Sequence, residues 1–454
     1  MNIYNPATNE VITQLETDTS STVNEKINLL RQGQKAWAAR PLTERIAILQ
    51  KFSTALQNDL EHCAAILTEE VGKPLQQARN EVNGACSRIE WLTTHAEKYL
   101  GDEWMTESGA TREKIVYEPL GIVGNISAWN YPYLVGTNVF VPALLAGNAV
   151  LYKPSELASL TGIEIQKHLY AAGVPENVFQ IAIGDRNVGE LLLQADLDGY
   201  FFTGSYPTGK YIYEQVSKKM KPCGLELGGK DPLYVTDDIT DIKTVAANTA
   251  DGAFYNNGQS CCSVERIYVH ENVYDAYIDA FRAEVNSYKT GQPTEEGVYI
   301  AALTRKQQPV FLEAQVNDAL AKGATLLCGG HIIESAGNFF EPTVLVNVTH
   351  DMAIMKEESF GPVIGIMKVK DDAEAIALMN DSLYGLTAAV YSQDENRAAR
   401  IQNQLNAGTV YWNCCDRVSA ALPWSGRKHS GFGSTLSHVG LRAFTQPKAY
   451  HLRS

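Results

Sequence analysis

The sequence predicts an α/β protein in which a doubly wound parallel sheet is followed by a second α/β region. Three observations support this fold class. Between residues 120 and 230, short apolar runs alternate with helical patterns, and the runs recur about every 25 to 30 residues. After residue 230 a similar alternation resumes. The chain of 454 residues is also long enough to bury a large core and to form two or three domains.

Residues 20 to 100 are predicted to form helices, because apolar side chains such as Leu49 and Phe52 recur there at helical spacing. Pro41 separates two of these helices, and the segment Glu70–Pro74 interrupts the next one. We expect this block to pack as amphipathic helices on a sheet.

The segment from Gly101 to Pro119 differs in composition. Residues 106–113 are polar and turn-like, and the short strand Lys114–Tyr117 follows them. An exposed β edge is a template for pairing, so we expect this strand to have a partner.

The next region predicts ligand-binding loops at the ends of buried strands. The run Leu120–Ile126 is apolar, and the polar Asn130 follows it. In open parallel sheets, ligands bind at the carboxyl ends of the strands. The pair Gly204-Ser205 also follows a predicted strand and opens a helix, whose free N–H groups suit a pyrophosphate. The other predicted elements are helix 135–145, strand 149–152, helix 160–172, strand 178–182, a helix opening at 184–189, and strand 199–203.

The second α/β region begins after Lys230. Its predicted elements are strand 232–235, helix 242–254, strand 266–270, a strand within 339–346, strand 408–413, and a terminal strand within 443–453.

Composition excludes several functional classes. The chain is 45% hydrophobic and 20% charged, and its net charge of -14, with no long basic run, argues against a nucleic-acid partner. The start shows no signal peptide, and the most apolar stretch, 120–151, is interrupted by Gly, Asn and Pro, so we expect no membrane span. The cysteines and histidines show no metal-binding spacing, which predicts no metal site and a cytoplasmic chain with reduced thiols.

Two short segments carry the strongest chemical signal. The first, Leu225–Lys230, places Glu226 beside a Gly-Gly pair, and the second, Phe254–Cys262, delivers Cys261 from a small, polar, turn-prone run. A thiol, a carboxylate and N–H donors are the groups needed for acyl transfer through a thioester. The residues alone also allow a second interpretation, in which Cys261 only packs in the core and Glu226 is a solvated surface acid.

These two segments resemble the paired signature of the NAD(P)-dependent aldehyde dehydrogenase superfamily, and further motifs occur in the family order over nearly the whole chain. The resemblance implies the aldehyde dehydrogenase fold: a Rossmann-like cofactor domain, an α/β catalytic domain and a β-hairpin oligomerisation arm. The implied boundaries are 1–100 and 120–230 for the NAD-binding domain, 231–430 for the catalytic domain, and 101–119 with 440–454 for the arm. It also implies a homodimer or homotetramer.

The resemblance implies three catalytic residues. Cys261 attacks the carbonyl of a small-molecule aldehyde, and Asn130 stabilises the oxyanion together with the Cys261 N–H. Glu226 activates the water that hydrolyses the thioester. An alternative is a superfamily member without activity, but such a chain is expected to lack the thiol or the carboxylate, and this one retains both. The adjacent Cys262 is expected to pack, although it could trap Cys261 under oxidation.

NAD is the cofactor expected from the resemblance, with NADP disfavoured. Glu156 can accept hydrogen bonds from the adenosine ribose and would repel a 2′-phosphate, while Lys153 and Ser155 offset part of this effect. Glu358 is expected at the nicotinamide ribose and Phe360 against the nicotinamide. The full set of expected cofactor-binding residues is Trp129, Lys153, Glu156, Gly184, Gly204, Ser205, Gly209, Leu227, Glu358 and Phe360.

Five residues are expected to line the substrate pocket: Tyr131, Asn138, Tyr255, Arg417 and Trp424. Semialdehyde-oxidising relatives typically hold Arg at the positions of Asn138 and Tyr255, and neither residue carries a charge here. The sequence therefore predicts aromatic or medium-chain aliphatic aldehydes as substrates. The alternative is a succinate-semialdehyde or related semialdehyde dehydrogenase, in which Arg417 swings into the pocket mouth and binds the distal carboxylate.

Overall fold

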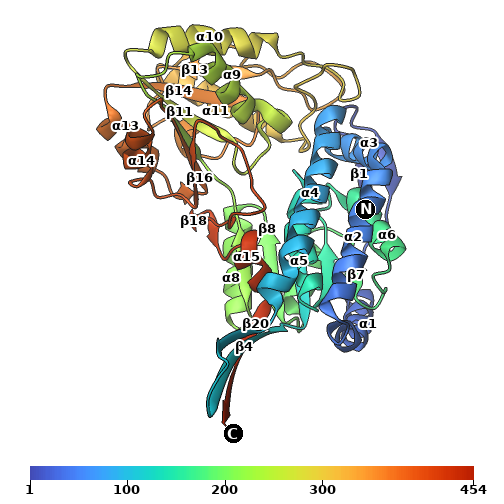
Figure 1. Cartoon of the computed structure of the whole chain (residues 1–454). Coiled ribbons are helices and arrows are strands. Elements are labelled where there is room, and N and C mark those ends of the chain that lie inside the picture. The colour runs from blue at the N-terminus through green and yellow to red at the C-terminus, as the bar shows by residue number, and fades with distance from the viewer. Residues whose placement is uncertain (454) are drawn as a thin grey trace.

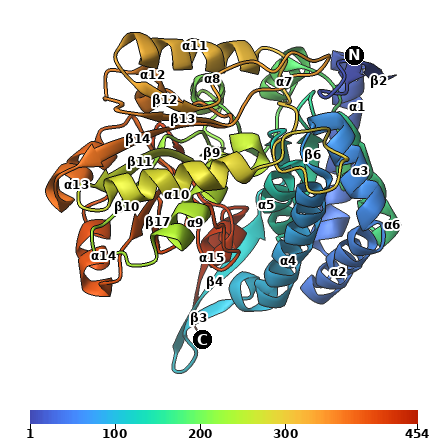
Figure 2. The same cartoon turned by 90° about the horizontal axis from the view of Figure 1, so that it is seen from above.

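The computed structural model describes residues 1–453 and contains two large sheets, one of six strands and one of seven. In Figure 1 the six-stranded sheet and the N-terminal helices form the lower part of the molecule, and the seven-stranded sheet and its helices form the upper part. Figure 2 shows the same two parts side by side from above. No helix in the described range is both long and apolar enough to cross a membrane.

The N-terminal block is helical, as predicted. After a small hairpin of β1 and β2, four helices follow. The apolar faces of α2, α3 and α4 are buried in one cluster, whereas Val23, Ile27 and Leu30 of α1 pack in another cluster against the six-stranded sheet. Helix α3 ends where Gly72 adopts a left-handed conformation with a φ of 83°, which glycine reaches without strain. The bounds are β1 Asn2–Tyr4, β2 Val11–Gln14, α1 Ser20–Ala38, α2 Leu42–Asn58, α3 Leu60–Val71 and α4 Leu75–Leu100.

The six-stranded sheet has the order β19-β9-β8-β5-β6-β7, and all its strands are parallel except β19, which is antiparallel to β9. Along the chain, β6 and then β7 are added on one side of β5, and β8 is then added on its other side. Between β5 and β8 lies a topological switch point, where sheets of this kind bind ligands. The bounds are β5 Ile122–Ile126, β6 Ala149–Lys153, β7 Phe179–Ile181, β8 Gly199–Thr203, β9 Cys223–Glu226 and β19 Gly431–Phe432.

Four helices connect the parallel strands: α5 Pro132–Leu145, α6 Ser159–Ala172, α7 Arg186–Gln194 and α8 Tyr206–Ser217. The first of them starts three residues before the predicted helix at 135, because Pro132 occupies its first turn, where the missing N–H costs nothing. The doubly wound prediction is confirmed.

The seven-stranded sheet has the order β12-β13-β14-β11-β10-β16-β17 and is parallel apart from β12. Its strands are β10 Asp231–Val235, β11 Val264–His270, β12 Thr325–Cys328, β13 Thr343–Val346, β14 Val363–Val369, β16 Thr387–Tyr391 and β17 Thr409–Trp412. Its helices are α9 Ile242–Phe254, α10 Tyr274–Ser287, α11 Gln308–Ala321, α12 Ala353–Lys356, α13 Asp372–Asn380 and α14 Glu395–Gln402. The short elements η1 Tyr255–Gly258, β15 Tyr384–Gly385, β18 Arg427–Lys428 and α15 Ser437–Arg442 lie in loops.

A three-stranded antiparallel sheet projects from the body (Figure 1). It consists of β3 Glu103–Thr106, β4 Thr111–Pro119 and the terminal strand β20 Thr445–Arg453. The expectation that strand 114–117 has a partner is confirmed, since β20 pairs with β4 from Thr445–Pro119 to Arg453–Thr111. The predicted strand 114–117 was too short. Polar residues at 111–113 join the strand because β20 supplies backbone partners along its whole length, an effect that local composition does not reveal.

Candidate active site

The candidate site forms at the switch point of the six-stranded sheet, where loops from both sheets meet. Asn130 follows β5, Gly204 follows β8, and Glu226 ends β9, while Cys261 precedes β11 of the other sheet. All four line one cavity of about 380 Å³. Residues that are distant in sequence are therefore brought together by the parallel topology, as the strand-end argument predicted.

A second cavity, of about 270 Å³, meets the first at the thiol. It is lined by residues of α4, of α5 and of the loop after β17, and it contains all five predicted substrate-pocket residues. Asn130 and Cys261 line both cavities. A nucleophile in this position can react with a ligand bound in either of the two cavities.

The loop that presents Cys261 has an unusual backbone. Asn256, Asn257 and Gly258 are all left-handed, with φ values of 55°, 58° and 69°. Asparagine tolerates this region better than other residues with a Cβ. Asn257 also holds the loop in place, since its Oδ1 accepts a hydrogen bond of 2.7 Å from the Ala301 N–H. The amide-rich segment predicted as turn-prone is thus a rigid, buried support for the thiol.

Asn130 is fixed through both its side chain and its backbone. Its Nδ2 donates to the Gln259 carbonyl at 3.1 Å, which leaves the second N–H of that amide for another acceptor. Its backbone carbonyl accepts from Asn256 Nδ2 at 3.1 Å and from Lys73 Nζ at 2.8 Å. Lys73 in turn forms a buried ion pair with Glu81.

Glu226 is buried, and its carboxylate accepts a hydrogen bond from the Thr435 hydroxyl. Burial raises the pKa of Glu226 to about 7, while the hydrogen bond from Thr435 opposes that rise. A carboxyl group with this pKa exchanges protons readily at neutral pH, which is the property required of a general base.

The cavity of about 380 Å³ contains a second carboxyl group whose pKa is raised. Glu358 accepts the Gly229 N–H at 3.0 Å, and burial together with repulsion from Glu265 raises the pKa of Glu358 to about 8. A Cβ on Gly228 would lie 2.3 Å from Glu358 Oε1, so the Gly-Gly pair is what admits this carboxylate. The ring of Phe360 packs edge-to-face on Trp129 with 5.4 Å between centroids.

The remaining predicted cofactor residues divide into two groups. Gly204, Ser205 and Leu227 line the 380 Å³ cavity, whereas Lys153, Glu156, Gly184 and Gly209 do not. Ser205 is the N-cap of α8 but makes no side-chain cap hydrogen bond, so N–H groups at this helix start remain available to an anion.

The other group has mixed roles. Lys153 is buried with its Nζ donating to the Pro154 carbonyl at 3.2 Å, and Glu156 is exposed at the end of β6. Gly209 serves packing, because a Cβ there would lie 2.4 Å from Leu227 Cδ2.

Comparison with known proteins decides the family. A family model described as the aldehyde dehydrogenase family matches residues 1–450. The chain belongs to the aldehyde dehydrogenase family. This membership makes it an oxidoreductase that works with NAD or NADP on a small aldehyde.

Individual relatives cover nearly the whole chain. A succinate-semialdehyde dehydrogenase [NADP(+)] from Deinococcus radiodurans is 33% identical, over 98% of this chain and 93% of its own. A chloroplastic betaine aldehyde dehydrogenase from Amaranthus hypochondriacus is 33% identical, over 98% of this chain and 91% of its own. The solved structure of an aldehyde dehydrogenase from Brucella melitensis biovar abortus superposes with a TM-score of 0.96 at 33% identity, covering 100% of this chain and 93% of that one.

The structure of this aldehyde dehydrogenase adds residues that the sequence analysis missed. Arg88 lines the 270 Å³ cavity and donates to Asn138 Oδ1 at 2.8 Å. Gln77, Glu81 and Arg88 are polar and lie at helical spacing along α4, on a face that we expected only to pack on the sheet. That spacing of polar residues within an apolar stripe was the available signal.

The lining that the sequence predicts for the substrate pocket omits one basic residue. Tyr131, Tyr255 and Trp424 do line the cavity, but Arg88 lines it with them. Arg417 lines it too, with a side chain that is 69% exposed and a guanidinium 3.8 Å from Asp251.

The second thiol is held differently from the first. Cys262 is buried and its Sγ donates to Asp416 Oδ1 at 3.0 Å. The hydrogen bond with Cys261, burial, and the negative charge of Asp416 raise the pKa of the Cys262 thiol, so the group stays protonated. A protonated thiol is a poor nucleophile, so Cys262 is not suited to attack a carbonyl carbon.

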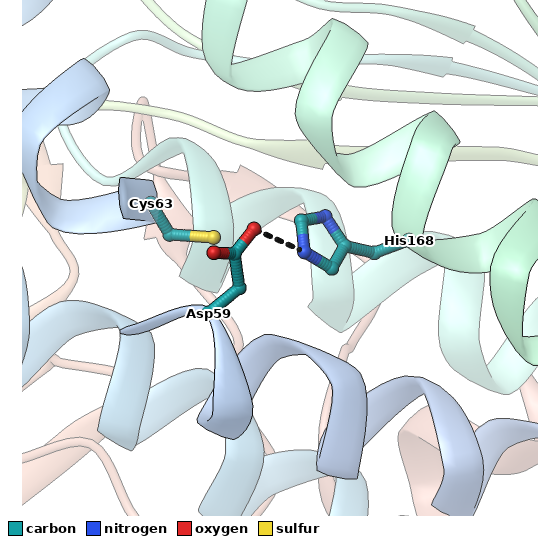
Figure 3. Close-up of side chains that lie close together, drawn as sticks. All are labelled: Asp59, Cys63 and His168. Atoms are coloured by element: carbon teal, nitrogen blue, oxygen red, sulfur yellow. Dashed lines mark hydrogen bonds and ion pairs between the residues drawn. The ribbon is translucent and has the colours of Figure 1, made fainter. Parts of the chain in front are cut away.

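One cluster outside the cavities has metal-ligand chemistry. Asp59, Cys63 and His168 lie together where α3 packs on α6 (Figure 3). His168 Nε2 is 3.1 Å from Asp59 Oδ2, and its Nδ1 is 2.7 Å from the Glu164 carbonyl. Both ring nitrogens thus have protein partners, and these hydrogen bonds account for the cluster as a link between the two helices.

Proposed function

We propose that this protein oxidises an aldehyde to its carboxylic acid with NAD, through a thiohemiacetal and then a thioester on Cys261. The observation that carries the proposal is the position of Cys261 and Asn130, which line both the cofactor-side and the substrate-side cavity. The buried carboxyl of Glu226 lines the first of these cavities.

In the first step the Cys261 thiolate attacks the carbonyl carbon, and the carbonyl oxygen takes up the negative charge. The free N–H of the Asn130 side chain and the backbone N–H of Cys261 donate to that oxygen. The hydrogen bond to the Gln259 carbonyl orients the Asn130 amide before the substrate arrives, and hydrogen bonds from Asn256 and Lys73 hold the Asn130 backbone carbonyl. Such preorganised donors stabilise an oxyanion without reorganisation.

The residues of the larger cavity fit a nicotinamide dinucleotide. The open N-terminus of α8 suits the pyrophosphate, the Glu358 carboxylate can accept hydrogen bonds from a ribose, and Phe360 offers an aromatic face. A bound nicotinamide would accept a hydride from the carbon attached to Cys261.

Hydrolysis of the thioester falls to Glu226. Its carboxylate takes a proton from water as the water oxygen attacks the acyl carbon, and the Cys261 thiolate leaves. With a pKa of about 7, Glu226 is ionised, and competent as a base, at pH values above 7.

The preference for NAD rests on Glu156. Its exposed carboxylate at the end of β6 would repel a 2′-phosphate, and like-charge contacts cost several kcal/mol. One relative is named for NADP, so the preference proposed here depends on the local charge of Glu156.

We also propose that residues 1–100 and 120–230 form the NAD-binding domain, residues 231–430 the catalytic domain, and residues 101–119 with 440–454 the oligomerisation arm. The projecting arm, whose edge strands are β20 and β3, is the surface on which we expect a homodimer or homotetramer to form. A reactive thiol that must stay reduced favours the cytoplasm.

Two variants test the chemistry. Cys261→Ser should abolish dehydrogenase turnover while NAD binding, measured by calorimetry, persists. Glu226→Gln should still release NADH in a rapid burst but should show a steady rate lower by about 10²-fold or more. Near-normal turnover of Cys261→Ser would contradict the nucleophile assignment, and loss of the burst in Glu226→Gln would place Glu226 earlier in the mechanism.

A further inference from the structure

We propose that Arg88, oriented by Asn138, binds a carboxylate at the far end of the substrate and thereby selects semialdehydes over uncharged and cationic aldehydes. This inference rests on the proposed aldehyde oxidation and names its substrate class and a specificity-determining residue.

The first support is position. Arg88 lies on α4 and lines the same 270 Å³ cavity as Cys261. Its Nη1 donates to Asn138 Oδ1 at 2.8 Å and to the Leu134 carbonyl at 3.4 Å, so two contacts from α5 hold the guanidinium at the cavity wall. An aldehyde whose carbonyl reaches Cys261 places its other end within this cavity.

The second support is an unbalanced charge. Among residues 1–453, Arg88 has no carboxylate within ion-pair distance, and its hydrogen bonds go to neutral oxygens, although the more distant carboxylates of Glu226 and Glu81 act on its charge. Burial lowers the pKa of its guanidinium, yet arginine keeps its charge in proteins. A desolvated cation without a carboxylate in direct contact is costly, and a bound carboxylate would supply that contact.

The third support is the geometry of the donors. Both protein contacts use Nη1, so within the described chain Nε and Nη2 carry no hydrogen bond to another residue. These two nitrogens lie on one edge of the planar guanidinium. That edge matches a carboxylate in bidentate fashion, which a lysine cannot reproduce.

The acidic groups of the cavity already accept hydrogen bonds from the protein, which argues against a cationic substrate. Glu81 is paired with Lys73 and accepts the Tyr133 N–H at 2.9 Å. Asp416 accepts from the Cys262 thiol at 3.0 Å, and burial raises its pKa to about 6. Arg88 is the basic residue of this cavity wall that has no carboxylate within ion-pair distance, whereas Arg417 has Asp251.

The test compares three aldehydes that differ in charge: the anionic glutarate semialdehyde, the uncharged pentanal and the cationic betaine aldehyde. We expect wild-type kcat/KM to be highest for the semialdehyde. Arg88→Gln should lower kcat/KM for glutarate semialdehyde by about 10-fold or more, mainly through KM, and should change pentanal by less than about 3-fold. Arg88→Lys should recover only part of the loss. Arg79→Gln is the matched control, since Arg79 lies on the same helix but pairs with Glu61 outside the cavity.

A binding measurement separates this inference from the proposed chemistry. Glutarate should bind wild type and Cys261→Ser alike by calorimetry, and Arg88→Gln should weaken it at least about 10-fold. If no aldehyde is oxidised but glutarate binding depends on Arg88, the proposed function fails and the carboxylate site stands. If Arg88→Gln leaves the semialdehyde-to-pentanal ratio unchanged, if Arg417→Gln alone removes it, or if betaine aldehyde is preferred, the inference is overturned.

Discussion

Removing the hydroxyl that supports Glu226 gives a quantitative test of its role as a base. Thr435 donates to this buried carboxylate and so favours its ionised form, while burial opposes ionisation and raises the pKa to about 7. Thr435→Val keeps the shape of the side chain and deletes the donor. A hydrogen bond to a charged group contributes about 1.5–3 kcal/mol, and 1.36 kcal/mol corresponds to one pKa unit.

The pKa of Glu226 in Thr435→Val should therefore rise by about 1–2 units. Ionised Glu226 is the active base, so the rate of thioester hydrolysis rises with pH through its pKa. In wild type the midpoint should lie near pH 7, and in the variant it should move upward. At pH 7 the ionised fraction falls from about one half to between about one tenth and one hundredth.

The assay should follow the acyl-enzyme itself. Enzyme acylated in a single turnover is quenched at intervals and the acylated fraction is measured by mass spectrometry between pH 5.5 and 9. The burst of NADH before hydrolysis serves as the internal control and should be preserved. An unchanged midpoint, or a midpoint that moves to lower pH, would refute the assignment of Glu226 as the base whose ionisation Thr435 supports.

Three further predictions follow from the geometry. Lys73→Met should lower the free energy of unfolding by about 3–5 kcal/mol, because Glu81 would remain buried without its partner. Urea denaturation measures this loss. The double variant Lys73→Met with Glu81→Gln should lose less unfolding free energy than Lys73→Met alone. In wild type, kcat/KM should be higher for NAD than for NADP by about 10-fold or more, and Glu156→Gln should make this ratio smaller. Equal kcat/KM values for the two cofactors in wild type would contradict the role of Glu156. Gly228→Ala should weaken NAD binding in calorimetry, because the added Cβ would lie 2.3 Å from the Glu358 carboxylate; unchanged affinity would show that this carboxylate does not contact the cofactor.

Much of the site can be anticipated from sequence because its parts follow local patterns. The apolar run that becomes β5 and the polar Asn130 after it are adjacent in the chain, and the parallel topology then determines where that side chain lies. The same holds for Gly204 after β8 and Glu226 at the end of β9. Strand periodicity, helix-start signals and turn residues act over a few positions, so the sequence by itself determined the element order and the edge of the sheet on which the ligand loops gather.

Only the tertiary structure showed which side chains from distant segments share a cavity or a charge. Thr435 lies 209 positions from the carboxylate that it supports, and Arg88 lies 50 positions from Asn138. The ion pair of Lys73 and Glu81 is close in sequence, but its contact with the Asn130 carbonyl is not. The pKa shifts depend on burial and on hydrogen bonds between side chains that come into contact only when the helices pack on the sheets. Local sequence patterns do not indicate these long-range contacts.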